Sequence, residues 1–386
     1  MKSAFEESER KSLQIVVAGM GFLGEYLIPG YRALCPHISS SVASVKGTEK
    51  GLKEKQARIP FPVTAGNLAQ VLWQRQPDIL VFSPPPEKAR SIFSEDIVPY
   101  LKKRTDTGEM PLVIYSFVPD IEPRWFSQEA GKEIPAAKIM PSMAEPIGNL
   151  DPSPLGGSLY TTAFWNEEQE TALQRFLAPF GESFHLEDSE TMAFLAGKIT
   201  SHLCCNLAMT LADGAMKHGM AVSTEEIGEA IRYFHRIRQE APPQELVPAR
   251  PKAVPEPLLS FLQKLEKAWF SGILDFTDSR RLSVEPETAE RISHLSFEMN
   301  VLSVQLENRD KLEENTRHHA TPGGLLEKGC ILYGKYVKKE LAEAMDRVFC
   351  DKISDSFFDL LEGWSFFITL SVFKHGGRLG KEAASE

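Results

Sequence analysis

The order of apolar and polar positions divides the chain into two differently built parts. Up to about residue 165, short apolar runs rich in Val and Ile alternate with polar or helical stretches and are bounded by Gly or Pro. This pattern predicts buried parallel strands joined by crossover helices, and therefore an α/β Rossmann domain with a doubly wound, mostly parallel sheet. The expected strands are Leu13–Ala18, Val42–Val45, Ile79–Phe82, Leu112–Tyr115, Lys138–Met140 and Ser158–Ala163.

After Asn166 the strand-like runs vanish and apolar residues recur at helical spacing. The expected helices are Glu167–Leu177, Thr191–His218, Glu225–Arg238, Leu258–Ala268, Pro286–Asn308, Leu325–Val348 and Ser354–Phe373. A dense set of prolines in residues 241–257 predicts an extended connection, because proline cannot sit inside a helix. We therefore expect a Rossmann dinucleotide-binding domain over residues 1–165 and an all-α domain over 166–386.

Composition and charge narrow the functional classes. The chain has 386 residues, of which 42% are hydrophobic and 25% charged, as in a globular protein. The formal net charge of −10, with no dense Lys/Arg block, argues against nucleic-acid binding. The first dozen residues are polar and show no secretory h-region. The most apolar stretch, Phe357–Phe373, contains Asp359 and Glu362 and is interpreted as a buried helix, so we expect a cytoplasmic protein without a membrane span.

The cysteines predict free thiols. Five are scattered along the chain, none forms a Cys-x-x-Cys pair, and their spacing matches no metal site. We expect no metal.

A glycine motif follows the first expected strand. Gly19, Gly21 and Gly24 form Gly-x-Gly-x-x-Gly, with Met20, Phe22 and Leu23 between them, and a helix is expected from Glu25. In a dinucleotide site the first glycine permits the turn, the second admits the pyrophosphate and the third lets helix and strand pack closely. Residues 19–24 are therefore candidate cofactor-binding residues. The alternative is a glycine-rich turn without a ligand.

The ends of the next two strands bear on the choice of cofactor. Lys46 and Thr48, with Lys50 nearby, follow the second strand, where a cation and a hydroxyl suit the 2′-phosphate of NADP. Glu49 keeps NAD as the alternative. After Ile79–Phe82, the residues Ser83, Pro84 and Pro85 are expected to border the cofactor; the alternative is that the prolines only terminate the strand.

Three further segments carry a family resemblance. They are Lys138–Gly148, Met192–Gly219 and Ala320–Glu327, which contains Thr-Pro-Gly-Gly-Leu-Leu-Glu. In this order they resemble the Met-Pro-Asn segment, the long dimer-forming helix and the Ser/Thr-Pro-Gly-Gly loop of the pyrroline-5-carboxylate reductase superfamily. The resemblance covers residues 13–230 and 318–350. It leaves about 235–317 as an extra segment of the helical domain.

The resemblance implies an NAD(P)H-dependent reductase of a C=N bond in a small carboxylate-bearing substrate, and a homodimer formed through the helical domain. Two departures from the family pattern bear on which substrate is expected. Leu326 stands where the reductases carry a hydroxyl, and Ser142, a candidate substrate-binding residue, stands in place of the family's Asn. The resemblance thus implies the fold and the reaction class rather than proline synthesis.

The Pro-Gly-Gly loop is a candidate anion site. Thr321, Gly323 and Gly324 directly precede the helix expected from Leu325. Free backbone N–H groups at a helix N-terminus suit a substrate carboxylate. The alternative is a simple turn.

Lys198 and His202 are the candidate catalytic residues. They lie one helical turn apart and share a face. A partly buried lysine of lowered pKa can act as a general acid, and the resemblance also extends to β-hydroxyacid dehydrogenases, which use a lysine in their helical domain. The alternatives are a solvated lysine and a core histidine. Thr200 and Ser201 are candidate hydrogen-bond donors to the substrate.

Three functions therefore remain open. The first is imine reduction with NADP(H). The second is a hydroxyacid or opine-type dehydrogenase that uses Lys198. The third, suggested by Leu326, is a non-catalytic NADP(H)-binding protein.

Overall fold

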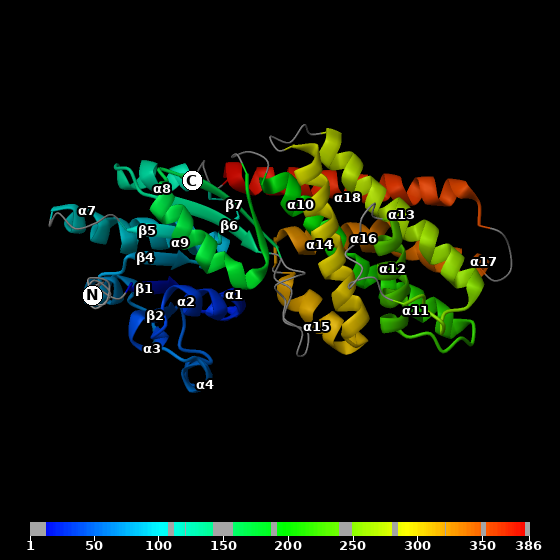
Figure 1. The fold of residues 1–386 in the computed structure, drawn as a ribbon, viewed down its shortest axis with the longest axis horizontal. Coiled ribbons are helices and arrows are strands. Elements are labelled where there is room, and N and C mark those ends of the chain that lie inside the picture. The colour runs from blue at the N-terminus through cyan, green and yellow to red at the C-terminus, as the bar shows by residue number, and fades with distance from the viewer. Residues whose placement is uncertain are drawn as a thin grey trace, which may run out of the picture. The chain divides into compact units, whose positions relative to one another are not determined.

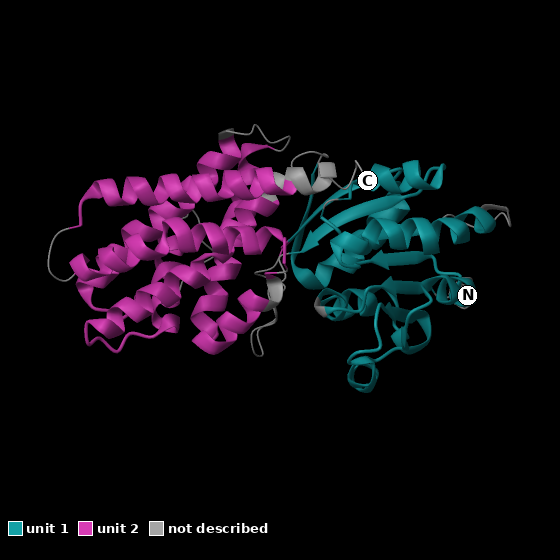
Figure 2. Cartoon of the chain, turned by 180° about the vertical axis from the view of Figure 1, so that it is seen from behind, with its two compact units in different colours: residues 1–143, 158–188 teal, residues 144–157, 189–386 magenta. Residues whose placement is uncertain are grey.

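The fold is that of a computed structural model, which separates into two compact units. Unit 1 comprises residues 1–143 and 158–188, and unit 2 comprises residues 144–157 and 189–386 (Figure 2). The structure describes residues 13–106, 112–119, 121–141, 157–186, 191–238, 249–279, 285–320, 322–348 and 353–382.

Unit 1 is built on an eight-stranded sheet with the order β3-β2-β1-β4-β5-β6-β7-β8 (Figure 1). The strands are β1 Ile15–Ala18, β2 Val42–Lys46, β3 Val63–Ala65, β4 Ile79–Phe82, β5 Val113–Ser116, β6 Ala136–Pro141, β7 Gly157–Ala163 and β8 Glu182–His185. The ladder from β3 to β6 is parallel, and β7 is antiparallel to β6. The predicted fold class, a doubly wound and mostly parallel sheet followed by a helical part, is confirmed.

The order in which successive strands are added to the sheet reverses at β1, although these strands all run parallel. From β1 the order runs to β2 and β3 on one side and to β4 and β5 on the other. Ala18, the last residue of β1, pairs with Val45 of β2 and Phe82 of β4. The carboxyl ends of three strands therefore meet at the position where doubly wound sheets bind their ligands.

Helices cover both faces of this sheet. They are α1 Phe22–Tyr26, α2 Ile28–Leu34, α3 Ile38–Ser41, α4 Leu52–Arg58, α5 Leu68–Arg75, α6 Pro86–Ile92, the π-helix η1 Phe93–Ile97, α7 Val98–Asp106, α8 Pro123–Ala130, α9 Glu167–Leu177 and the 3₁₀ turn η2 Ala178–Phe180. Successive strand residues point to opposite faces: Val17 joins the apolar cluster that includes α2 and α9, whereas Val16 joins the cluster that includes α5 and α8. Both clusters are buried, which explains the continuous apolar runs.

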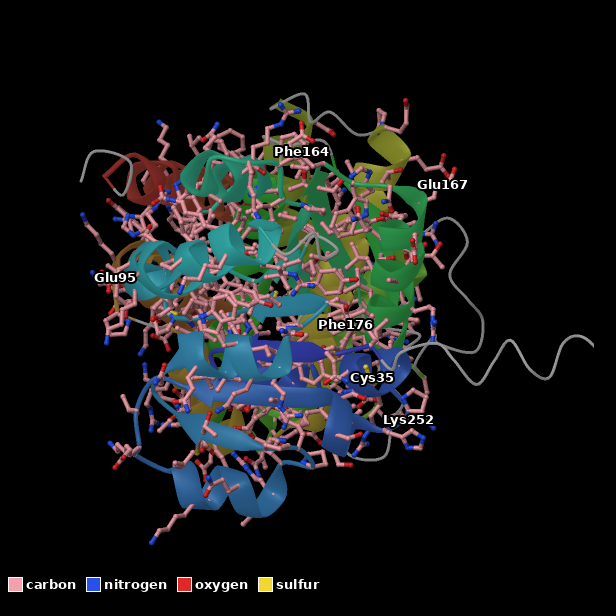
Figure 3. All side chains as sticks on the ribbon, turned by 90° about the vertical axis from the view of Figure 1, so that its left-hand side faces the viewer. Cys35, Glu95, Phe164, Glu167, Phe176 and Lys252 are labelled. Carbon is pink, nitrogen blue, oxygen red and sulfur yellow. The ribbon has the colours of Figure 1, made fainter. Side chains whose placement is uncertain are left out.

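Helix α9 belongs to unit 1. Its buried Phe176, labelled in Figure 3, lies within ring-contact distance of Tyr31 of α2 and Tyr115 of β5. Gly30 allows this packing, because a Cβ there would lie 2.8 Å from the Phe176 ring. Unit 1 therefore extends to Asp188, whereas the sequence placed the division at residue 165.

Strand β8 was not predicted. Its residues, Glu-Ser-Phe-His, are only partly buried at the edge of the sheet and lack an apolar run. Strand β3, with three residues, was missed for the same reason.

Unit 2 is helical in all its described elements. They are α10 Thr191–His202, α11 Cys204–Lys217, α12 Thr224–Arg238, α13 Glu256–Ser279, α14 Pro286–Leu306, α15 Arg309–His319, α16 Leu325–Tyr336, α17 Lys338–Val348 and α18 Asp355–Glu382. The predicted helix Thr191–His218 is interrupted at Leu203, and α13 is longer than predicted. The predicted helix Leu325–Val348 is interrupted at Val337, and α18 continues beyond the predicted end at Phe373 to Glu382. The other expected helices are present within a few residues, and the polar α15 was missed.

The core of unit 2 depends on a close crossing of α13 and α18. A Cβ on Gly272 of α13 would lie 2.3 Å from the carbonyl oxygen of Glu362 in α18. Next to this crossing, Ser365 donates to the Trp269 carbonyl at 2.6 Å, and Thr369 donates to the Thr200 hydroxyl at 2.9 Å. Polar groups in this core are thus hydrogen-bonded, as burial requires.

Helix α18 was interpreted as a buried helix. Within the described residues, its segment Asp355–Gly376 is the one stretch long and apolar enough to cross a membrane by length and composition, and 33% of its most apolar window is buried in the structure. Phe358 and Ile368 are buried, whereas Leu360 and Phe367 are 56% and 42% exposed. The helix therefore buries one face and leaves an apolar face uncovered.

Candidate functional site

The glycine turn after β1 is held from two sides. Gly19 has φ +101°, and a Cβ there would lie 2.3 Å from the carbonyl oxygen of Ser83. Its N–H donates to the Val45 carbonyl at 3.0 Å. A Cβ on Gly24 would lie 2.8 Å from the Gly19 carbonyl. A larger residue at Gly19 or Gly24 would therefore clash with the backbone of the protein itself.

Gly21 differs from both. A Cβ there would meet no atom within 4 Å, and Gly21 is the N-cap residue of α1, which has no side-chain cap. The space in front of the turn is thus open at the residue where a pyrophosphate must approach the backbone. The turn fits a dinucleotide.

The residues between these glycines have separate places. Met20 is 1% exposed and packs in the core, so it supports the turn from behind rather than facing a ligand. Leu23 is partly buried against the same apolar cluster. The Phe22 side chain lies outside the described residues.

The end of β2 combines a positive charge with a hydroxyl. Lys46 donates to the Thr48 hydroxyl at 3.0 Å, to the Thr48 carbonyl at 3.1 Å and to the Lys50 carbonyl. The ammonium is therefore folded onto its own turn, which keeps it at the tip of the strand. This arrangement is compatible with a 2′-phosphate, but the ammonium would have to exchange some of these bonds.

Ser83 supports the glycine turn. Its hydroxyl donates to the Gly19 carbonyl at 2.8 Å. Pro84 is buried and Pro85 is exposed. Because its proton is engaged within the protein, Ser83 is better described as a residue that shapes the turn than as a cofactor donor.

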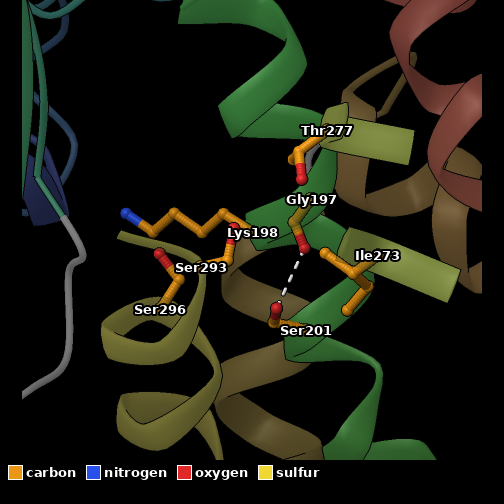
Figure 4. Close-up of a pocket in the computed structure, with 7 residues that line it drawn as sticks. All are labelled: Gly197, Lys198, Ser201, Ile273, Thr277, Ser293 and Ser296. Carbon is orange, nitrogen blue, oxygen red and sulfur yellow. Dashed lines mark hydrogen bonds between the residues drawn. The ribbon is translucent and has the colours of Figure 1, made fainter. Parts of the chain in front are cut away.

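In unit 2, a small pocket lies beside Lys198 (Figure 4). Its lining comes from α10, α13 and α14 and consists of Gly197, Lys198, Ser201, Ile273, Thr277, Ser293 and Ser296. Lys198 extends past Ser293 and Ser296. The structure thus brings the candidate lysine together with four side-chain hydroxyls.

Lys198 is the group of this pocket that can change its charge near neutral pH. Burial lowers its pKa from 10.5 to about 7. Removal from water disfavours the ammonium, so the side chain can give and take a proton near pH 7.

Three of these hydroxyl-bearing residues were missed by the sequence analysis. Thr277, Ser293 and Ser296 lie in the segment 235–317, which resembles no family segment. Ser201 was predicted, and it does line the pocket; its hydroxyl donates to the Gly197 carbonyl at 3.0 Å. A serine in a helix gives no local signal of a site, and only the packing of α13 and α14 on α10 reveals this group.

Neither His202 nor Thr200 is among the pocket residues. His202 hydrogen-bonds through Nδ1 to Asn300 at 3.2 Å and through Nε2 to Thr316 at 3.4 Å, and so connects α10 with α14 and α15. Thr200 is fully buried, donates to the Ala196 carbonyl at 3.1 Å and accepts from Thr369. Thr200 is therefore a core residue, which corrects its assignment to substrate binding.

The predicted anion site at the Pro-Gly-Gly loop contains a carboxylate of the protein itself. The Gly323 N–H donates to the Glu327 carboxylate at 2.7 Å, and Gly324 is the N-cap residue of α16. Glu327 thus satisfies a donor that was expected to bind the substrate. Thr321 and Ser142 lie outside the described residues.

The sequence predicted free cysteine thiols and no metal site, and the residues concerned lie outside the two candidate sites. Cys35, Cys204, Cys205 and Cys330 are free, and Cys350 lies outside the described residues. No group of three or more His, Cys, Asp or Glu side chains suited to a metal occurs in the part of the chain that the structure describes.

Comparison with known proteins gives remote structural similarities. No protein-family model matches the chain, and no curated protein matches it. Pyrroline carboxylate reductase from Plasmodium falciparum, solved with NADP bound, is 14% identical with a TM-score of 0.36, covering 91% of this chain and 98% of that one. The 1-pyrroline-5-carboxylate reductase of Streptococcus pyogenes is 14% identical with a TM-score of 0.42, over 91% and 98%.

An imine reductase variant from Myxococcus stipitatus, in complex with NAD+, is 14% identical with a TM-score of 0.35, over 79% of this chain and 99% of that one. Scores below 0.5 at this identity do not assign the chain to a family. The function is therefore argued from the two candidate sites.

Proposed function

We propose that the protein is an NAD(P)H-dependent oxidoreductase that reduces a C=N bond in a small carboxylate-bearing substrate. The observation that carries this proposal is the glycine turn at the reversal of the strand order. Two of its glycines are closed against the protein, and Gly21 faces open space. The open position lies at the carboxyl end of β1, where the strand order reverses and where a diphosphate would approach the backbone.

In this proposal the backbone N–H groups of residues 19–24 hold the diphosphate of the coenzyme. When bound, a nicotinamide coenzyme supplies a hydride. Lys46 and Thr48 favour NADP over NAD, because their charge and hydroxyl suit a 2′-phosphate.

Lys198 is proposed as the general acid. Reduction of an imine or a ketone requires a proton on the nitrogen or oxygen, and general acids work best when their pKa lies near the working pH. A pKa of about 7 meets this requirement. His202 is proposed as a positioning residue, because its two hydrogen bonds fix α10 one turn from Lys198.

The same lysine favours a second candidate function, a hydroxyacid or opine-type dehydrogenase. There the lysine exchanges a proton with the substrate oxygen and is essential. In reduction of an already protonated imine it contributes less. The structure of the Pro-Gly-Gly loop favours a third candidate, a non-catalytic NADP(H)-binding protein, because Leu326 is buried and Glu327 fills the loop.

The test is NADPH oxidation by the full chain with a panel of cyclic imines and 2-oxo acids, repeated with Lys198→Met. Turnover with imines that is lowered but not abolished in Lys198→Met supports imine reduction. Turnover confined to oxo acids and abolished in Lys198→Met supports the dehydrogenase. Tight NADPH binding with no turnover across the panel supports the non-catalytic protein and contradicts both enzymes.

We also propose a homodimer formed through unit 2, and a cytoplasmic location. Helix α11 does not supply the contact surface, because its apolar side chains Leu207, Leu211 and Ala215 are fully buried within the chain. The better support is the uncovered apolar face of α18, with Leu360 56% exposed. Sedimentation velocity of wild type and of Leu360→Glu tests the dimer. The proposal predicts that the variant shifts toward monomer. A wild-type protein that is monomeric at micromolar concentration contradicts the proposal.

A further inference from the structure

A carboxylate next to the glycine turn pairs with two cations of another helix. Glu25 follows Gly24 directly and lies in the first turn of α1. One of its carboxylate oxygens pairs with the Lys55 ammonium of α4, and the other pairs with the Arg58 guanidinium at 2.7 Å. Lys55 and Arg58 are three positions apart on α4, so they share a face of that helix. Glu25 thus joins α1 to α4 through both of its oxygens.

Most of this contact is shielded from water. The side chains of Glu25 and Lys55 are 18% and 15% exposed, whereas that of Arg58 is 56% exposed. Exposed ion pairs stabilise proteins little, because water and salt screen them. A mostly buried pair is screened less, and a buried carboxylate without a partner is unfavourable. The pair of Glu25 and Lys55 is therefore the stronger half of the contact.

Helix α4 is weakly anchored by apolar packing. Every residue of Leu52–Arg58 is at least partly exposed. Leu52 packs partly against an apolar cluster of unit 1, and Gln56 donates to the Val63 carbonyl at 2.8 Å, which connects α4 to β3. The pairing with Glu25 adds the connection from α4 to α1, the helix that follows the glycine turn.

Helix α4 also follows directly on the turn that carries Lys46 and Thr48. The Lys46 ammonium is folded onto this turn by its hydrogen bonds to Thr48. The turn ends at Gly51, the N-cap residue of α4, whose φ is +70°. A Cβ on Gly47 or Gly51 would meet no atom within 4 Å, so the turn is not packed against the rest of unit 1 at these two positions. The position of the turn therefore depends on the elements that flank it, β2 and α4.

In the proposed function the coenzyme meets both turns at once. Its diphosphate lies at residues 19–24 and its 2′-phosphate lies at the turn after β2, and the covalent structure of the coenzyme limits the distance between them. The glycine turn is held by contacts of its own, because the Gly19 N–H donates to the Val45 carbonyl and the Ser83 hydroxyl donates to the Gly19 carbonyl. A link between α1 and α4 therefore affects the 2′-phosphate position more than the diphosphate position.

We propose that Glu25 is a positioning residue that sets a preference for NADPH over NADH. Through Lys55 and Arg58 it holds α4, and with α4 the turn after β2, at the distance from the glycine turn that a 2′-phosphorylated coenzyme requires. This inference rests on the proposed function, since it names a residue that governs the choice of coenzyme at the same site. Glu25 acts through α4, because both of its oxygens are engaged by the two cations.

An explanation by charge alone makes a different prediction. Without Glu25, two cations would be left uncompensated and would attract the additional phosphate of NADPH. Glu25→Gln would then strengthen NADPH binding, whereas Lys55→Met, which removes a cation, would weaken it. If Glu25 acts by position, both variants break the same link and both weaken NADPH binding. The two variants together therefore separate position from charge.

Isothermal titration of NADPH and of NADH into the full chain tests the inference. The quantity measured is the ratio of the two Kd values in wild type, in Glu25→Gln and in Lys55→Met. In both variants the preference for NADPH is expected to fall about threefold to tenfold, while the affinity for NADH stays within about twofold of wild type. A role in folding alone would weaken the binding of both coenzymes alike and would leave the ratio unchanged.

Glu54→Gln and Lys53→Met are the matched controls. Both residues are exposed on α4, and neither takes part in the pairing with Glu25. They change the charge of the same helix by the same amounts, and both should keep the wild-type ratio. Alanine is well tolerated in helices, so Glu25→Ala replaces Glu25→Gln if that variant fails to fold.

The inference is overturned if Glu25→Gln keeps the wild-type ratio, if it binds NADPH more tightly than wild type, or if the controls shift the ratio as much. A wild type that binds both coenzymes equally tightly overturns this inference and leaves the proposed function standing. A wild type that binds neither coenzyme contradicts the proposed function and this inference together.

Discussion

At the scale of single residues, the three glycines of one motif have three different physical reasons. Gly19 and Gly24 are required by close contacts inside the protein, whereas Gly21 borders open space. The sequence predicted these roles from spacing alone, because the strand before the motif and the helix after it were both recognisable. It could not predict that Ser83 is engaged with the Gly19 carbonyl, since the two residues lie far apart in the chain.

The glycines should therefore respond differently to alanine. Gly19→Ala is expected to destabilise the protein by about 1–3 kcal/mol, because its Cβ meets the Ser83 carbonyl and its φ is positive. Gly21→Ala should change the free energy of unfolding by less than about 0.5 kcal/mol. Urea unfolding measures both; equal losses would contradict the described geometry of the turn.

Lys198 makes stability depend on pH in a defined direction. Burial holds its pKa near 7 in the folded state, against 10.5 for an unburied lysine. Between these values the unfolded chain binds more protons, so the free energy of unfolding should gain a rising contribution from Lys198 as the pH increases from 7 to 10.5. Lys198→Met should lose this contribution and be more stable than wild type at pH 7. Denaturant unfolding at pH 7 and 9 provides the check, and parallel pH profiles would refute the burial of the amine.

At the scale of elements, unit 2 contains a buried polar chain that joins three helices. His235 of α12 hydrogen-bonds through Nδ1 to Glu266 of α13 at 2.7 Å and through Nε2 to His294 of α14 at 3.0 Å. Arg238 donates to the same carboxylate at 2.6 Å. Burial alone would raise the pKa of Glu266, but the hydrogen bonds and charges of His235 and Arg238 lower it. This hydrogen-bonded chain of polar side chains fixes the register of the three helices relative to one another.

This polar chain should make the protein sensitive to acid. Burial, together with the charges of His235 and Arg238, lowers the pKa of His294 from 6.5 to about 3. The unfolded state therefore binds more protons between pH 6.5 and 3, and stability falls as the pH is lowered through that range. His294→Gln places a non-titrating amide at this position. Between pH 7 and 5 the free energy of unfolding should therefore fall by about 1–2 kcal/mol less in the variant than in wild type. Identical losses would show that His294 is free to protonate when folded.

The crossing of α13 and α18 offers a matched pair of variants. Gly272→Ala should destabilise by about 1–3 kcal/mol, because its Cβ would force the two helices apart. Gly363→Ala, on α18 with no atom within 4 Å of its Cβ, should be neutral or stabilise by about 0.5–1 kcal/mol. Thermal unfolding of both variants measures these two changes in stability. A Gly272→Ala protein as stable as wild type would disprove the close crossing.

Sequence patterns predicted most elements and missed those without an apolar run. The strands at the centre of the sheet have two buried faces and read as continuous Val and Ile runs. The edge strand β8 and the polar helix α15 lack that signal. The break at Leu203 was missed because the apolar spacing continues through it.

At the scale of the whole molecule, each unit carries one candidate site. Fold class and the glycine turn could be predicted, because strand composition and motif spacing are local. The pocket could be predicted only through Lys198 and Ser201, since Ser293 and Ser296 come from a helix nearly a hundred residues later in the chain. The engagement of the Pro-Gly-Gly loop by Glu327, one turn into α16, was not predicted, because Glu327 was not considered as a partner for the Gly323 N–H.

The central claim is that unit 1 holds a nicotinamide coenzyme at the open glycine turn. Isothermal titration of NADPH and NADH into the wild-type full chain and into Gly21→Ala tests it most directly. The account predicts saturable binding by wild type, tighter for NADPH, and at least about tenfold weaker binding by Gly21→Ala, whose methyl group occupies the space the pyrophosphate needs. No heat of binding for either coenzyme in folded wild-type protein, or equal affinity in Gly21→Ala, would contradict it.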